Sequence, residues 1–229
     1  MYYAVSPPKT ILQLNLDVNT IENFQLPGQY QITHLSSLTH LPTGEIILVM
    51  KCDDRIEIVN WSPTKFRPLK IIDDFVELCF VDWKVFAIGG RLHPASFVYE
   101  LSIDQWRDIA PVPEPRDMFS LTPCGDSIYL IGGKIFSNFI IKVDRYIIDQ
   151  NRWCDNQVKL PTGISNPGTV KVSDHQVFIF GGQTCTAVTV SSFTMDTTNH
   201  LLNRAVLLKH CGSFKGEPAY YRSRVFAFD

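Results

Sequence analysis

The sequence predicts an all-β protein, built as a propeller or another array of repeated sheets. Three observations carry this prediction. Short apolar runs recur with a period in the forties, three of these runs end in paired glycines, and no stretch sustains the 3.6-residue apolar period of a helix. We therefore expect twisted antiparallel strands, with fewer than about a tenth of the residues in helices.

The recurring runs each contain four consecutive apolar residues, at 46–49, 85–88, 128–131 and 177–180. The last three are followed by Gly89-Gly90, Gly132-Gly133 and Gly181-Gly182, in steps of 43 residues (89 to 132) and 49 residues (132 to 181). Because the runs are apolar at every position, we expect strands that are buried on both faces. The glycines are interpreted as structural residues that end the second strand of each sheet with positive φ or close packing.

A pair of aromatic residues recurs after two of the glycine pairs. Tyr99 precedes Trp106 by seven residues, and Tyr146 precedes Trp153 by seven. Turn-forming residues lie between the members of each pair, so the frame predicts two strands joined by a tight turn. We expect both tryptophans to be largely buried against the next sheet, each beside the tyrosine of its own repeat. The frame is expected in degenerate form at 14–21, 59–66 and 193–200.

Prolines separate one repeat from the next. The run from Pro111 to Arg116 closes one unit and opens another, whose first strand is expected at 118–122. Pro27 and Pro161 occupy comparable positions. Proline suits a connection between sheets, because no ladder hydrogen bond there needs the missing N–H donor.

Together these landmarks resemble the Kelch repeat, which has an apolar strand, Gly-Gly, a Tyr and a Trp seven apart, and Pro-Arg before the next strand. The segment from Pro115 to Trp153 carries all of them, and the resemblance is strongest over 76–200. It implies a Kelch-type β-propeller of four-stranded antiparallel blades, expected as a single domain over 1–229. Counting strands predicts about five blades, one of them a composite of both chain ends. The alternative is part of a six- or seven-bladed ring.

Composition and charge exclude several classes of function. The formal net charge is −2 and Lys and Arg form no cluster, which excludes a basic footprint for nucleic acid. No apolar run approaches the roughly 18–20 residues that cross a bilayer, so no membrane insertion is expected. The amino terminus does not read as a signal peptide, so we expect a cytoplasmic or other intracellular location, cytoskeletal association included. The six cysteines are expected as reduced, mostly buried thiols.

Motifs of catalysis are not found in the sequence. The six histidines form no pair at metal-ligand spacing, and Gly132-Gly133-Lys134 leads into a strand-like segment rather than into a phosphate-binding helix. The adjacent pairs Asp53-Asp54 and Asp73-Asp74 are interpreted as turn residues, because neighbours in a strand face opposite ways. The sequence therefore predicts no catalytic residue, no metal site and no cofactor.

The Kelch resemblance implies that partners dock on loops at one face, after Gly-Gly and after Pro-Arg. Carried onto this chain, the candidate partner-binding residues are Arg91, His93, Lys134, Phe136, Arg116 and Asp117. We expect a non-catalytic protein–protein interaction or scaffold module within a larger intracellular assembly, with other proteins as partners. The alternative is a small-molecule enzyme that uses the central funnel of the propeller. That would need an inward cluster of His, Arg and Glu, and the strands show no such excess.

Overall fold

The computed structural model describes residues 2–6, 9–15, 18, 20–33, 37–90, 94–186 and 192–205. Within these ranges the regular structure consists of strands and turns without a helix, which confirms the all-β prediction. The described part of the chain thus offers no helix with the length and apolar character to cross a membrane.

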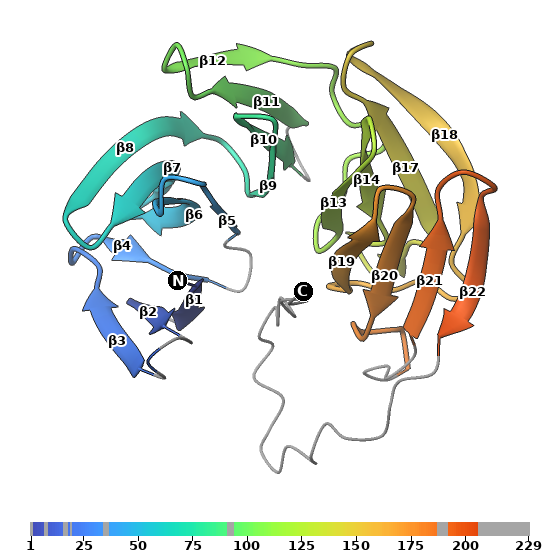
Figure 1. Ribbon diagram of the computed structural model, residues 1–229, viewed down its shortest axis with the longest axis horizontal. Coiled ribbons are helices and arrows are strands. Elements are labelled where there is room, and N and C mark those ends of the chain that lie inside the picture. The colour runs from blue at the N-terminus through green and yellow to red at the C-terminus, as the bar shows by residue number, and fades with distance from the viewer. Residues whose placement is uncertain are drawn as a thin grey trace. The chain divides into compact units, whose positions relative to one another are not determined.

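The strands are antiparallel and are labelled in chain order in Figure 1. Their bounds are β1 (Tyr2–Ser6), β2 (Thr10–Asn15), β3 (Thr20–Gln25), β4 (Tyr30–Gln31), β5 (Leu38–His40), β6 (Ile46–Cys52), β7 (Arg55–Ser62), β8 (Lys65–Ile72), β9 (Val76–Val81), β10 (Lys84–Gly89), β11 (Ala95–Glu100), β12 (Gln105–Asp108), β13 (Ser120–Cys124), β14 (Ser127–Ile131), β15 (Lys134–Ile135), β16 (Asn138–Phe139), β17 (Lys142–Ile147), β18 (Arg152–Lys159), β19 (Gly168–Ser173), β20 (Gln176–Phe180), β21 (Ser192–Asp196) and β22 (Leu201–Ala205).

The chain divides into two compact units, residues 1–115 and 116–229. The first unit holds the sheets β1–β3, β4–β8 and β9–β12, and the second holds β13-β14-β17-β18, the small β15–β16 pair and β19–β22. The single domain, the blade number and the composite blade stay predictions. The composite blade is expected to take its carboxy-terminal strands from 218–222 and 225–228, which lie outside the described residues.

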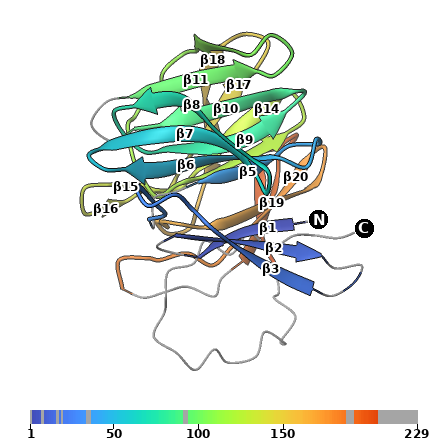
Figure 2. The ribbon, with the colours of Figure 1, turned by 90° about the vertical axis from the view of Figure 1, so that its left-hand side faces the viewer.

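Strand β6 shows how a continuous apolar run is used. Ile46, Leu48 and Met50 belong to a core shared with the β1–β3 sheet, whereas Ile47 and Val49 belong to a core shared with the β9–β12 sheet. Figure 2 shows β6 beside β7 within the first unit. Burial on both faces is therefore confirmed for this run, as it is for 85–88 and 128–131. The run at 177–180 differs, because Phe178 and Phe180 are only half-buried.

The glycine pairs end β10, β14 and β20, and all six residues have positive φ, from 61° at Gly181 to 154° at Gly89. The positive φ expected at these positions is therefore present. At Gly132 close packing also excludes a side chain, because a Cβ added to it would lie 2.4 Å from the Ile164 carbonyl oxygen. No side chain fits there without moving backbone.

The two aromatic pairs meet as predicted. Tyr99 stacks on Trp106 with ring centroids 5.0 Å apart, and the rings of Tyr146 and Trp153 lie 5.3 Å apart. Both tryptophans have most of their surface buried, although neither is fully buried. Their strands, β12 and β18, are the outermost of their sheets, and the Lys70 ammonium of β8 lies 6.0 Å from the centroid of the Trp106 ring.

Of the three degenerate residue pairs that the sequence predicts, one is correct and two are wrong. Leu14 pairs with Ile21 as expected, but the two-residue turn of β7–β8 makes Trp61 rather than Val59 the partner of Phe66. His200 lies in the β21–β22 turn. The last two strands of these sheets form a hairpin, and the second residue pair from its turn occupies the same place each time. These pairs are Leu14/Ile21, Trp61/Phe66, Tyr99/Trp106, Tyr146/Trp153 and Met195/Leu202. This position therefore takes large apolar side chains, which need not be aromatic.

Candidate functional site

The two kinds of loop that the sequence pointed to adjoin in the second unit. The Asp117 N–H donates to the Lys134 carbonyl at 3.0 Å, and the Lys134 N–H donates to the Asp117 carbonyl at 2.8 Å. Ser165 and Gln183 exchange the same two bonds, each at 2.8 Å. In both four-stranded sheets of this unit, the residue after the glycine pair is therefore fixed to the loop before the first strand.

The loop after Gly133 forms a hairpin that the sequence analysis did not predict. Strands β15 and β16 pair through Lys134–Phe139 and Ile135–Asn138, and Phe136 lies at the tip with 74% of its surface exposed. We call residues 134–141 the apolar hairpin. Its local signal was the pair Ser137-Asn138, turn-forming residues between apolar neighbours.

Backbone hydrogen bonds fix the base of the apolar hairpin. The Ile140 N–H donates to the Gly133 carbonyl at 2.9 Å, and the Ile141 carbonyl accepts from the Leu160 N–H at 2.8 Å. The Lys134 ammonium lies 4.6 Å from the centroid of the Phe139 ring, a cation–π contact. The hairpin therefore presents Phe136 from an anchored base.

Arg116 is not a surface residue, which corrects its assignment as a partner-binding residue. The residue is 1% exposed, and its guanidinium donates to Asp144 in β17 at 2.6 Å. Lys142 also contacts the Asp144 carboxylate, at 3.0 Å. Arg116 therefore ties the first loop of its sheet to the third strand of that sheet. Among the other candidates, Asp117 and Lys134 are half-buried, and Arg91 and His93 lie outside the described residues.

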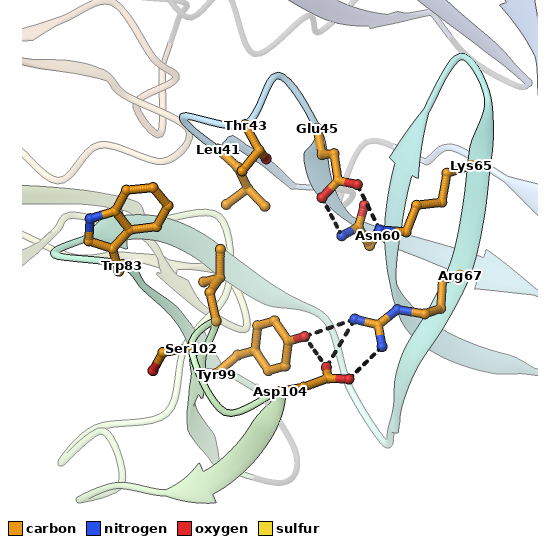
Figure 3. Close-up of a pocket in the computed structure, with 11 residues that line it drawn as sticks. Leu41, Thr43, Glu45, Asn60, Lys65, Arg67, Trp83, Tyr99, Ser102 and Asp104 are labelled. Atoms are coloured by element: carbon orange, nitrogen blue, oxygen red, sulfur yellow. Dashed lines mark hydrogen bonds and ion pairs between the residues drawn. The ribbon is translucent and has the colours of Figure 1, made fainter.

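A pocket of about 600 Å³ lies in the first unit, and Figure 3 shows its side chains. It opens at the hairpin turns, at the strand ends opposite to the glycine pair that ends β10. Its lining residues are Leu41, Thr43, Glu45, Asn60, Lys65, Arg67, Trp83, Tyr99, Leu101, Ser102 and Asp104. Sequence reasoning missed this pocket, because its residues come from four separate hairpins.

Charged side chains on one side of the pocket are paired with one another (Figure 3). Arg67 donates to both Asp104 oxygens, at 2.8 and 3.0 Å, and to the Tyr99 hydroxyl at 2.9 Å; that hydroxyl in turn donates to Asp104. Lys65 donates to Glu45 at 2.7 Å. The hydrogen bond from Asn60 and then the one from Lys65 hold the pKa of Glu45 below its usual range. Burial raises the pKa of Tyr99.

Asp104 is expected to remain ionised in acid. The hydrogen bond from Arg67, and then that from Tyr99, lowers the pKa of Asp104 from 3.8 to about 2. Because the folded-state pKa is depressed, the stabilisation by this carboxylate is complete above its ordinary pKa and is lost as the pH falls through about 2. Carboxyl ¹³C NMR at pH 3 should therefore find Asp104 ionised. Replacing Arg67 by Met should raise its pKa toward 3.8, whereas Arg107→Met should not, since Arg107 pairs with Glu100. A wild-type inflection near 3.8 would contradict this.

Ligand groups for a metal are not gathered in the part of the chain that the structure describes, where no three His, Cys, Asp or Glu side chains form such a set. Cys52, Cys79 and Cys124 are buried free thiols, Cys154 is half-buried and Cys185 is exposed. Burial raises the pKa of the Cys124 thiol. Cys211 lies outside the described residues.

Four-stranded antiparallel sheets with buried inner strands and glycine-ended second strands define the class: these are blades of the β-propeller type. No protein-family model matches the chain. It is 28% identical over 168 residues to Kelch repeat and BTB domain-containing protein 2 of cowpox virus, covering 68% of this chain and 30% of that protein. It is 29% identical over 147 residues to Kelch-like protein 41b of Danio rerio, covering 62% and 24%.

A third relative, tRNA wybutosine-synthesizing protein 4 of Candida albicans, is 36% identical over 90 residues, covering 38% of this chain and 13% of that protein. The matched regions thus span less than a third of each of these three relatives. The similarities to Kelch-like and Kelch-repeat proteins support membership of the Kelch-repeat family and confirm the resemblance drawn from the repeat landmarks.

Proposed function

We propose that this protein is a non-catalytic interaction module that docks another protein through the apolar hairpin. Kelch-repeat proteins are generally protein-interaction modules. The observation that carries the proposal is Phe136, which is 74% exposed at the tip of a hairpin anchored by backbone hydrogen bonds. The proposed setting is a larger intracellular assembly.

The conformation of Phe136 supports a role in binding rather than in folding. Its φ is 54°, a left-handed conformation that is rare for a residue with a bulky side chain. The exposed ring contributes little to the core, and Ile141 at the base of the hairpin is a second exposed apolar side chain, 43% exposed. Large aromatic side chains held in place lose little conformational entropy on binding, so they are enriched among the residues that dominate interface energies.

Replacing Phe136 by alanine is expected to weaken partner capture by at least about tenfold, because an interface anchor contributes about 2 kcal/mol or more. The measurement is quantitative mass spectrometry of proteins captured from native extract by immobilised wild type and variant. The melting temperature should stay within about 2 °C, since an exposed side chain is removed.

Val172→Ala is the matched control, because Val172 belongs to the same unit and is 57% exposed on β19. It should retain the partners that Phe136→Ala loses. If every protein that wild type captures is held equally by Phe136→Ala, the apolar hairpin is not the docking site and the proposal is wrong.

A further inference from the structure

Trp83 stands in the turn between β9 and β10 in an unfavourable conformation. Val81 pairs with Lys84, so Asp82 and Trp83 form a two-residue turn, with φ of 45° and 59°. Asn-Gly or Asp-Gly is preferred in a turn with both residues at positive φ. A side chain in the left-handed region costs about 1–2 kcal/mol, and the Trp83 ring is 57% exposed. The ring meets Phe80 edge-on, with centroids 6.4 Å apart, but more than half of its surface stays exposed, so packing alone does not account for tryptophan in this turn.

Trp83 borders the first-unit pocket on its apolar side. Figure 3 shows Trp83 and Leu41 on one side and the ion pairs of Lys65 and Arg67 on the other, and Leu101 also lines the cavity. An occupant therefore meets apolar groups on one side and polar groups on the other.

The charges of the pocket determine the charge of its occupant. Glu45 pairs with Lys65, and Asp104 pairs with Arg67, so the four groups sum to zero. An anion or a cation would be attracted by one member of a pair and repelled by the other, and a tight contact would break an existing ion pair. An uncharged group leaves both pairs intact, so charge complementarity favours a neutral occupant.

The openness of the pocket indicates the kind of molecule that occupies it. The side chains of Lys65, Arg67 and Asp104 are 48%, 41% and 58% exposed. Small-molecule sites enclose most of their ligand, whereas this pocket is open to solvent along its charged side chains. An open surface that combines Trp, Tyr and Arg has the residue types that dominate protein–protein contacts.

We propose that this pocket binds a segment of a partner protein through one uncharged aromatic side chain, which packs on the side of Trp83, Leu41 and Leu101. Aromatic rings gain about 0.5–1.5 kcal/mol beyond area burial when they meet edge-to-face or offset, so an aromatic group fits Trp83 better than an aliphatic one. The site is independent of the apolar hairpin, which belongs to the other unit and to the loops beside a glycine pair.

The test uses the full ¹⁵N-labelled chain and three capped peptides, acetyl-Gly-Phe-Gly-amide and its Lys and Glu counterparts. The indole N–H signal of Trp83 should shift saturably with the Phe peptide, with a dissociation constant on the order of millimolar. The Lys and Glu peptides should bind at least about fivefold more weakly, because they disturb the ion pairs. The signal of Trp153, in the other unit, should not move.

Trp83→Gly is the decisive variant, because glycine suits the positive φ of this turn. That gain offsets the lost ring contact with Phe80, so the variant should melt close to the wild-type temperature. It should weaken binding of the Phe peptide at least about tenfold, read from the remaining pocket signals. Ile103→Ala, which removes a 57% exposed residue that does not line the pocket, should bind like wild type, and so should Phe136→Ala. The proposal is overturned if no peptide gives a saturable shift, if a charged peptide binds as tightly, or if Trp83→Gly binds normally.

Discussion

Replacing Arg116 by alanine is expected to lower the free energy of unfolding by about 3–5 kcal/mol, because the variant leaves the Asp144 carboxylate buried without its guanidinium. Both side chains are almost inaccessible, at 0% and 2% exposed, and their closest atoms lie 2.6 Å apart. Lys142 remains within 3.0 Å of Asp144, so the carboxylate keeps one cation, but that ammonium is 33% exposed and partly hydrated. Urea denaturation followed by circular dichroism measures the loss.

Arg145→Ala is the matched control for this prediction. Arg145 pairs with Asp126 at 2.9 Å in the same sheet, but the two side chains are 27% and 64% exposed. An exposed pair of this kind contributes about 0–1 kcal/mol. Equal losses from Arg116→Ala and Arg145→Ala would contradict the view that Arg116 is a structural residue of the second unit.

A double replacement distinguishes the destabilisation caused by an unpaired buried charge from the destabilisation caused by lost packing. In Arg116→Met with Asp144→Leu neither buried charge remains, and apolar residues of similar volume often replace buried ion pairs at little cost. The double variant should therefore recover most of the stability that Arg116→Ala loses. A double variant as unstable as the single one would mean that Arg116 acts through other contacts.

The outer hairpins show how far local spacing predicts structure. A seven-residue step corresponds to the four-residue turn of β11–β12 and β17–β18, so the aromatic pairs Tyr99/Trp106 and Tyr146/Trp153 were found from the sequence. The β21–β22 hairpin keeps the same step between Met195 and Leu202. No aromatic pair marks the register there, so the expected pair, Phe193 and His200, stands two residues before the observed one.

Arg116 and the pocket show why the rest could not be predicted. The partner of Arg116 lies 28 residues further along the chain, so nothing in the proline-rich segment around Arg116 distinguishes a buried arginine from a loop arginine. Arg67 and Asp104 are likewise 37 residues apart, on strand β8 and in the β11–β12 turn. Such pairs form only when sheets assemble, whereas strands and glycine turns follow from neighbouring residues.

Gly132→Ala is the second replacement with a large expected effect. The residue has a φ of 67°, which costs an alanine about 1–2 kcal/mol. Its new Cβ would lie 2.4 Å from the Ile164 carbonyl oxygen, which is backbone and accepts the Gly133 N–H at 2.8 Å. Moving that carbonyl breaks the hydrogen bond and strains the packing, at a further cost of about 1–3 kcal/mol. The urea midpoint should fall accordingly.

Gly44→Ala separates the two parts of this cost. Gly44 has a similar φ of 84°, but a Cβ added to it meets nothing within 4 Å. It therefore carries the conformational penalty without the steric one, and its loss of stability should be about 1–2 kcal/mol. The difference between the two variants measures the close approach of Gly132 to Ile164. If both variants lose the same free energy, positive φ alone explains the glycine at 132. The contact with Ile164 would then have no part in selecting it.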